Sequence, residues 1–134
     1  MIDNERMKII INEMEHYLNE IEKIGIKSES DLDYLRFPAI SMNLLSLVNK
    51  IIDLGEELLA GKKLGMPSTY RDVFVILEKN NLINSSLSKN LQILAKYRNI
   101  LAHEYGTLYK KDIIFLLTKL RYVKEFERLV KKMI

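Results

Sequence analysis

Hydrophobic residues recur along most of the chain at intervals of three or four positions, the spacing that places side chains on one face of an α-helix. No stretch shows the strict alternation of a half-buried strand. The first apolar stripe stops just before Gly25, and glycine commonly follows the last turn of a helix. A first helix ending at Gly25 is therefore predicted. Its stripe consists of Met7, Ile10, Ile11, Met14, Tyr17, Leu18, Ile21 and Ile24.

The second helical pattern follows two serines and contains a proline. Ser28 and Ser30 each precede an acidic residue by three positions, which is a capping-box spacing, and Pro38 is expected to interrupt or kink the segment they start. The stripe then runs to Gly61 and includes Gly55, where the missing side chain would let a neighbouring helix approach closely. The apolar residues are Ile40, Leu44, Leu47, Val48, Ile51, Leu58 and Leu59.

Three further helices are predicted in the second half of the chain. After a surface loop over residues 61–67, Ser68 is a plausible N-cap for a short third helix. The fourth helix is expected to end near Gly106 with that glycine in the left-handed conformation, and the fifth to begin near Lys110. Their apolar residues are Val73, Phe74 and Leu77, then Leu87, Leu91, Leu94, Ala95, Tyr97 and Leu101, and finally Ile113, Leu116, Leu117, Leu120, Val123, Phe126, Val130 and Met133.

These patterns predict an all-α fold, a compact bundle of about five helices whose long neighbours run antiparallel across short connections. A length of 134 residues fits one domain, residues 1–134. The content of 48% hydrophobic and 29% charged residues is typical of a soluble globular protein, and no apolar run approaches the roughly 20 residues that span a bilayer. The polar, acidic start from Met1 to Arg6 is unlike a secretory signal. We therefore expect a cytoplasmic protein without membrane association.

Charge is distributed unevenly along the chain. Residues 1–67 contain 8 Lys and Arg against 12 Asp and Glu, whereas residues 68–134 contain 13 against 6. On an ideal helical wheel the last helix presents a basic arc opposite its apolar face, which could follow a polyanion such as RNA but is also what a solvated helix face usually looks like. The arc consists of Arg121, Lys124, Arg128, Lys131 and Lys132.

Few residues in this chain can carry acid–base chemistry near neutral pH, because it has two histidines and no cysteine. One histidine, His16, is expected to be exposed and without function. The other belongs to the string Arg98-Asn99-x3-His103-Glu104-Tyr105 at the end of the fourth helix. The apolar face of that helix centres on Arg98, so its guanidinium needs a partner there. The partner is either a carboxylate of another helix or an anion brought by a substrate.

This string resembles the motif of the HEPN superfamily and, within it, of the HepT-like ribonuclease toxins that pair with a nucleotidyltransferase antitoxin. Residues 65–70, followed by Phe74 and Leu77, resemble the family's connection into its short third helix. The resemblance implies a HEPN-like four-helix-bundle core, a homodimer, an RNA substrate and a cognate nucleotidyltransferase antitoxin. It also implies that Arg98 and His103 are catalytic and that Tyr105 accepts nucleotidyl groups from the antitoxin.

Metal-independent RNA cleavage requires a proton acceptor for the ribose 2′-hydroxyl, a proton donor for the 5′-oxygen and a cation for the phosphate. Histidine, with an ordinary pKa of about 6.5, and arginine supply these functions. His103 lies about 140° from Arg98 around an ideal helix, so a symmetric dimer that brings two copies together suits the reaction better than one chain. Asn99 would orient the backbone or substrate.

The sequence contains no zinc-type His/Cys spacing and no glycine-rich phosphate loop, so neither a metal nor a cofactor is expected. Asp53, Glu56 and Glu57 on the second helix could contact the motif or a magnesium ion, or could simply be solvated. Two alternative functions remain. The chain could be a catalytically inactive HEPN-like module that partners a nucleotidyltransferase or binds nucleotides, or a structural bundle in which Arg98 pairs internally.

Overall fold

The computed structural model describes residues 1–103 and 105–134, and of Tyr105 only the backbone. All the regular elements in these ranges are helical, which confirms the predicted all-α fold. The elements are α1 (Asn4–Ile24), the 3₁₀ turn η1 (Glu29–Asp31), α2 (Arg36–Gly61), α3 (Tyr70–Lys79), α4 (Ser85–His103), the 3₁₀ turn η2 (Tyr105–Thr107), α5 (Lys110–Leu117) and α6 (Leu120–Lys131).

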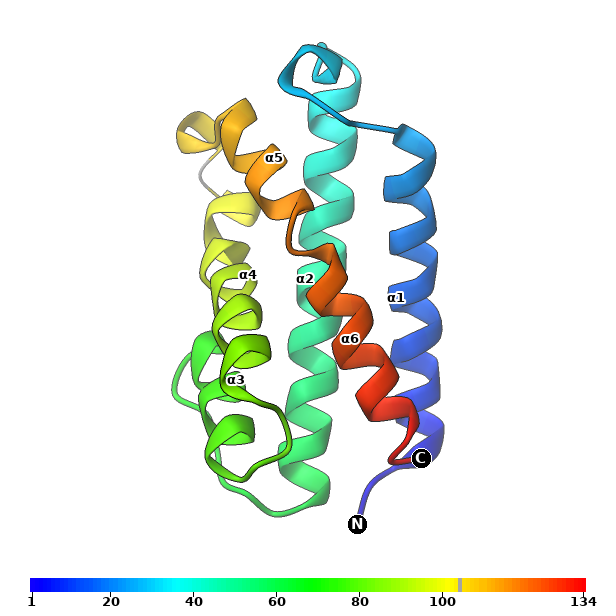
Figure 1. Ribbon diagram of the computed structural model, residues 1–134, viewed down its shortest axis with the longest axis vertical. Coiled ribbons are helices and arrows are strands. Elements are labelled where there is room, and N and C mark those ends of the chain that lie inside the picture. The colour runs from blue at the N-terminus through cyan, green and yellow to red at the C-terminus, as the bar shows by residue number, and fades with distance from the viewer. Residues whose placement is uncertain (104) are drawn as a thin grey trace.

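The helices form an up-and-down bundle (Figure 1). Helix α2 runs back along α1, and these two helices make the most extensive contact in the described chain. Helix α4 runs antiparallel to α2 on its other side, while α5 and α6 cross in front and return to the end where the chain starts. At that end the amino group of Met1 donates a hydrogen bond of 2.7 Å to the carbonyl of Gly61. Helix α3 packs against both α2 and α4.

Helix α2 is the central helix of the bundle. It contacts α1, α3 and α4, and its buried residues occupy several sides of the helix. A helix covered on several sides is apolar around much of its circumference. For this reason α2 is, by length and composition alone, apolar enough to cross a membrane, a test that the core helix of a soluble protein also passes. Its buried residues are Ile40, Ser41, Leu44, Leu47, Val48, Ile51, Ile52, Leu54, Gly55, Leu58 and Leu59.

The entry to α2 differs from the prediction. The capping box of Ser28 with Asp31 is present, but it starts only the short turn η1. Helix α2 begins at Arg36, whose backbone N–H donates 2.8 Å to Oδ1 of Asp33. Pro38 therefore lies in the first turn, where a backbone N–H has no intrahelical acceptor to lose. The expectation that Pro38 interrupts the helix is wrong for this reason.

The structure also differs from three other local predictions. The N-cap of α3 is Thr69 instead of Ser68, since the Thr69 hydroxyl accepts 3.1 Å from the N–H of Asp72. Gly106 lies in η2 without a positive φ, so it is not a left-handed helix cap. The predicted fifth helix is two helices, because the chain leaves α5 at Thr118, whose hydroxyl donates 2.6 Å to the carbonyl of Phe115.

Gly55 permits the close packing of α3 on α2, as predicted. A Cβ at this position would overlap Cγ1 of Val73 and would lie 3.5 Å from Cε1 of Phe74. On its other side Phe74 packs edge-on against Phe126 of α6, with ring centroids 5.8 Å apart. The α3 helix is thereby held between α2 and α6, and Tyr70, its first residue, is held beside α4.

Candidate functional site

Arg98 lies where α2, α3 and α4 meet. Its side chain is half-buried, and its Nε donates a hydrogen bond of 3.0 Å to Oδ1 of Asn49 on α2. Its Nη1 donates 3.2 Å to Oδ1 of Asn99, the next residue of α4. Its Cζ lies 5.2 Å from the ring centroid of Tyr70, the first residue of α3. Two neutral amides and an aromatic ring thus hold this guanidinium.

The predicted position of Arg98 on the inner face of its helix is consistent with this half-burial, but the partner is not an acid. Among residues 1–103 and 105–134, no carboxylate lies within 4.0 Å of its guanidinium nitrogens. The alternative of a structural bundle requires an internal ion pair of Arg98, and these residues provide no carboxylate partner for it.

A cavity of about 540 Å³ opens beside Arg98 between α1, α2, α3 and α4. Its second cation, Lys50, is paired at 2.7 Å with Glu13 and lies 3.7 Å from Asp53. The bond to Glu13 raises the pKa of Lys50. Arg98 is therefore the cation of this cavity whose charge is not matched by a carboxylate among the described residues. The lining residues are Tyr17, Ser46, Asn49, Lys50, Ile52, Asp53, Glu56, Tyr70 and Arg98.

Two of the acidic residues singled out on the second helix line this cavity. Desolvation, followed by the negative charges of Asp53 and Glu57, raises the pKa of Glu56. Within the described residues, no group of three or more His, Cys, Asp or Glu side chains is arranged to hold a metal ion. Asp53 and Glu56 are thus neighbours of Arg98 across a cavity and do not pair with it.

His103 is the last residue of α4 and is exposed. Because the α-helix persists through His103, the direction of this side chain still differs from that of Arg98 by about 140° around the axis. The structure does not bring the two side chains into contact within one chain. A reaction centre that uses both requires a second copy or a movement of the long Arg98 side chain.

The other two predicted site residues are Asn99 and Tyr105. Asn99 is exposed and lines a cavity of about 430 Å³ at the start of α3, together with Glu56 and Tyr70. Its Oδ1 accepts from Arg98, so its Nδ2 is the side-chain group that could donate to a ligand. Tyr105 begins η2, and its side chain lies outside the described part of the structure.

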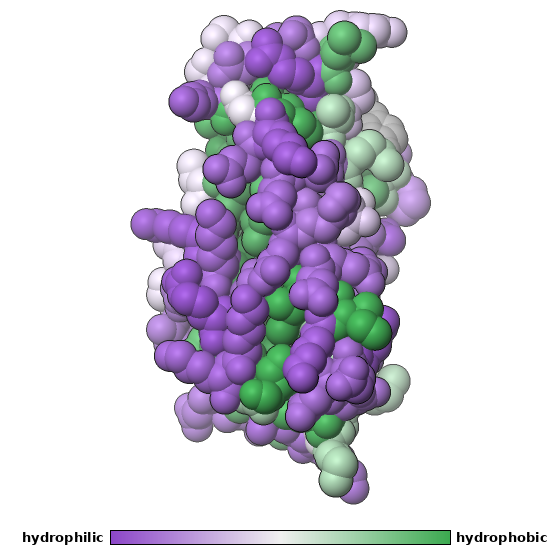
Figure 2. All heavy atoms as spheres, turned by 90° about the vertical axis from the view of Figure 1, so that its right-hand side faces the viewer, coloured by the Kyte–Doolittle hydropathy of each residue, from purple (hydrophilic) through white to green (hydrophobic). Residues whose placement is uncertain are grey.

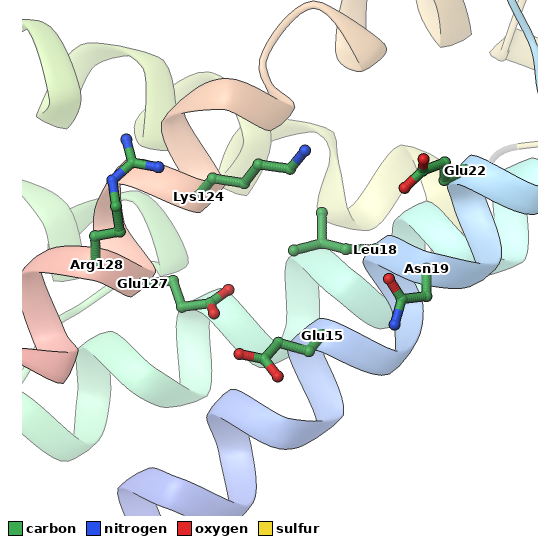
Figure 3. Close-up of a pocket in the computed structure, with 7 residues that line it drawn as sticks. All are labelled: Glu15, Leu18, Asn19, Glu22, Lys124, Glu127 and Arg128. Carbon is green, nitrogen blue, oxygen red and sulfur yellow. The ribbon is translucent and has the colours of Figure 1, made fainter.

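A second cavity, of about 310 Å³, lies between α1 and α6 (Figure 3). Glu15 and Glu127 point toward each other across it, and Lys131 bridges them at 2.7 and 3.0 Å. Lys124 extends from α6 toward α1, whereas the guanidinium of Arg128 points away from Glu15. One residue of the predicted basic arc, Lys131, is therefore paired with carboxylates of the same chain. The adjoining α1 face is mostly hydrophilic, with hydrophobic residues visible only in patches between polar ones (Figure 2).

Two residues of the Arg98 environment, Asn49 and Tyr70, were not predicted from the sequence to contact it. The signal for Asn49 was its position as a polar residue between the buried Val48 and Ile51 of the central helix. Tyr70 lies in the segment that was recognised only as a connection to the third helix. The link from either residue to Arg98 spans 28 or more positions and exists only in the folded bundle.

Comparisons with known proteins agree with this architecture. A family model described as Ribonuclease HepT-like matches residues 14–133. The mRNA nuclease HepT of Shewanella oneidensis is 30% identical over 126 residues, which cover 91% of this chain and 93% of that protein.

Solved structures give the same result. A chain of a toxin–antitoxin complex with AMP-PNP matches with a TM-score of 0.88 and 25% identity, over 96% of this chain and 99% of that one. The tri-AMPylated Shewanella oneidensis HEPN toxin in complex with the MNT antitoxin matches with a TM-score of 0.87 and 26% identity, over 97% and 99% of the two chains. The family model and the nuclease relative both extend over nearly the whole chain, and this protein therefore belongs to the HepT-like ribonuclease family.

Proposed function

We propose that this protein is a metal-independent endoribonuclease toxin that cleaves RNA in a cleft between two copies of the chain. The observation that carries the proposal is the guanidinium of Arg98, held beside a cavity by neutral groups, with no carboxylate partner among the described residues. Such a cation is available to a phosphodiester. The relative named as an mRNA nuclease supports RNA as the substrate.

In this mechanism Arg98 binds the scissile phosphate and stabilises the negative charge of the phosphorane. His103 of one copy accepts the proton of the ribose 2′-hydroxyl as the 2′-oxygen bonds to phosphorus. His103 of the other copy donates a proton to the 5′-oxygen as its bond to phosphorus breaks. The products are a 2′,3′-cyclic phosphate and a free 5′-hydroxyl. Two copies are required because the motif supplies one histidine per chain, which cannot readily perform both transfers.

Asn99 and Tyr105 have supporting functions in this proposal. The Oδ1 of Asn99 accepts from Arg98, so its Nδ2 is the group that orients the substrate. A cognate nucleotidyltransferase antitoxin neutralises the toxin by nucleotidylating Tyr105, which adds negative charge next to the site that binds phosphate. The solved complex of a tri-AMPylated HEPN toxin with its MNT antitoxin supports this mode of control.

The test is RNA cleavage by the purified protein and by Arg98→Ala and His103→Ala. We expect each substitution to lower kcat by about 10²- to 10³-fold, the range typical for loss of a transition-state cation or of an acid–base group. His16→Ala is the matched control, and cleavage by the unchanged protein should persist in EDTA. Circular dichroism and sedimentation velocity would establish that the variants remain folded dimers.

Full activity of folded His103→Ala would contradict the assignment of the histidine. If the unchanged protein cleaves no RNA yet binds the nucleotidyltransferase or a nucleotide, and Arg98→Ala abolishes that binding, the chain is the inactive binding module instead.

A further inference from the structure

We infer that Asn49 of α2 and Tyr70 of α3 are positioning residues that hold the Arg98 guanidinium ready for a phosphate while leaving its charge unneutralised. This inference rests on the proposed ribonuclease function and extends it to two residues outside the Arg-x4-His motif. The two residues come from helices that the fold, and not the local sequence, brings to Arg98.

Asn49 fixes the direction of the guanidinium. The Nε–H of arginine only donates, so Asn49 must present its Oδ1, and the 3.0 Å distance is that of a well-formed hydrogen bond. Nε is the nitrogen nearest the aliphatic stem, and a bond there restricts rotation about the end of the side chain. Because Nη1 gives one N–H to Asn99, the second N–H of Nη1 and both N–H groups of Nη2 are then left for a phosphate. Because an arginine side chain has many rotamers in solution, this restriction is favourable for a site that must bind repeatedly in one geometry.

Tyr70 supports the flat side of the same group. Its ring centroid lies 5.2 Å from Cζ of Arg98, within the range of a cation–π interaction. Tyr70 is exposed, with 39% of its surface accessible, and it lines the cavity beside Arg98. Its place depends on the Thr69 cap and on the close approach of α3 to α2 at Gly55. The ring therefore sits on a supported helix end and not on a free loop.

The neutrality of both contacts is the informative feature. Lys50, in the same cavity, is paired with Glu13 and Asp53, so local carboxylates balance its charge. An aspartate at position 49 would also accept from Nε, and more strongly, but it would balance the charge of Arg98 in the same way. Arg98 uses two of its five N–H groups on the amides of Asn49 and Asn99. Enough donors remain for a two-point contact with phosphate oxygens.

The test compares RNA cleavage by Asn49→Asp, Asn49→Ala, Tyr70→Leu and Tyr70→Phe in the full-length protein. Asn49→Asp should lower kcat by about tenfold or more and weaken the dependence of KM on salt, since one positive charge no longer faces the RNA. Asn49→Ala should lower kcat by about fivefold with little change in KM. Tyr70→Phe should restore most of the activity that Tyr70→Leu loses, because the ring, and not the hydroxyl, contacts the cation.

Asn43→Asp is the matched control on the same helix. Asn43 is likewise partly buried, but its Nδ2 donates to the carbonyl of Ala39 in its own helix, away from Arg98. This variant should cleave RNA like the unchanged protein. A loss in Asn43→Asp equal to that in Asn49→Asp would overturn the inference, because the effect would then be general destabilisation of α2.

A measurement without RNA separates the inference from the proposed function. The Nε–H proton of Arg98, observed by ¹⁵N NMR, should exchange with water several-fold faster in Asn49→Ala than in the unchanged protein, even if no RNA is ever cleaved. If Arg98→Ala abolishes cleavage while Asn49→Asp and Tyr70→Leu cleave normally, the positioning roles are refuted and the proposed function stands. If the unchanged protein is inactive, the proposed function fails whatever the exchange rates show.

Discussion

Replacement of Gly55 by alanine is expected to destabilise this protein, although alanine is the better helix former. In a helix interior, alanine is favoured over glycine by about 1 kcal/mol. The added Cβ would overlap Cγ1 of Val73, whereas Phe74 and Leu77 lie at the ordinary contact distances of 3.5 and 3.6 Å. The entire cost therefore depends on one methyl group.

That methyl group cannot move away easily. Val73 is fully buried in α3, and a β-branched residue in a helix has one strongly preferred χ1 rotamer. Overpacking of this kind costs about 1–3 kcal/mol. With a cost near the upper end and the propensity gain subtracted, the free energy of unfolding should fall by about 1–2 kcal/mol. In a Val73→Ala background the obstacle is gone, so Gly55→Ala should stabilise by up to about 1 kcal/mol.

The assay is urea denaturation followed by circular dichroism at 222 nm for the four proteins of this double-mutant cycle. The coupling energy between the two positions should be about 2–3 kcal/mol, with a change of sign in the effect of Gly55→Ala. An equal effect in both backgrounds, or stabilisation of the unchanged protein by Gly55→Ala, would show that the contact between α2 and α3 is not as tight as the structure indicates.

Two further predictions concern other parts of the bundle. Burial, followed by the hydrogen bond with Glu15, raises the pKa of Glu127, so the folded state keeps a proton that the unfolded state releases. The free energy of unfolding should then fall as the pH rises from about 4.3 through the raised pKa of Glu127. Glu127→Gln should remove this fall, and at pH values above that pKa it should be about 1 kcal/mol more stable than the unchanged protein. Thermal melts from pH 4 to 8 that run parallel for the two proteins would contradict this. Asn84→Ala should cost about 1 kcal/mol in urea denaturation, because Oδ1 of Asn84 accepts 2.8 Å from the N–H of Leu87 and caps α4, whereas Asn12→Ala, at an exposed position within α1, should cost less. Equal losses in the two asparagine variants would argue against the cap.

Local chemistry predicted some helix ends correctly and others not. Gly25 does close α1 in the left-handed conformation, because glycine alone meets no steric penalty there. The start of α2 and the break after α5 were not predicted. Pro38 is equally compatible with a helix start and a helix break, and Asp33 decides between them by accepting from Arg36. The hydroxyl of Thr118 competes for a carbonyl that the apolar pattern does not register.

The proposed catalytic motif can be recognised from the sequence because its residues are close together in the chain. Arg98, Asn99 and His103 lie within six positions, and helical periodicity alone places Arg98 on the inner face. What the guanidinium contacts could not be predicted. The sequence left open a carboxylate or a substrate anion, and the groups that contact it in the described structure are instead the amides of Asn49 and Asn99 and the ring of Tyr70.

The sequence by itself determined the helices, their apolar faces and the string of residues that identifies the family. These properties depend on neighbours three or four positions apart, so short-range periodicity is enough to specify them. Only the tertiary structure decided that Arg98 is held by neutral partners 49 and 28 positions away, that Lys50 is balanced by Glu13, and that α4 stays helical through His103. Contacts of this kind arise from how the helices pack, and packing is a property of the whole bundle that no single segment contains.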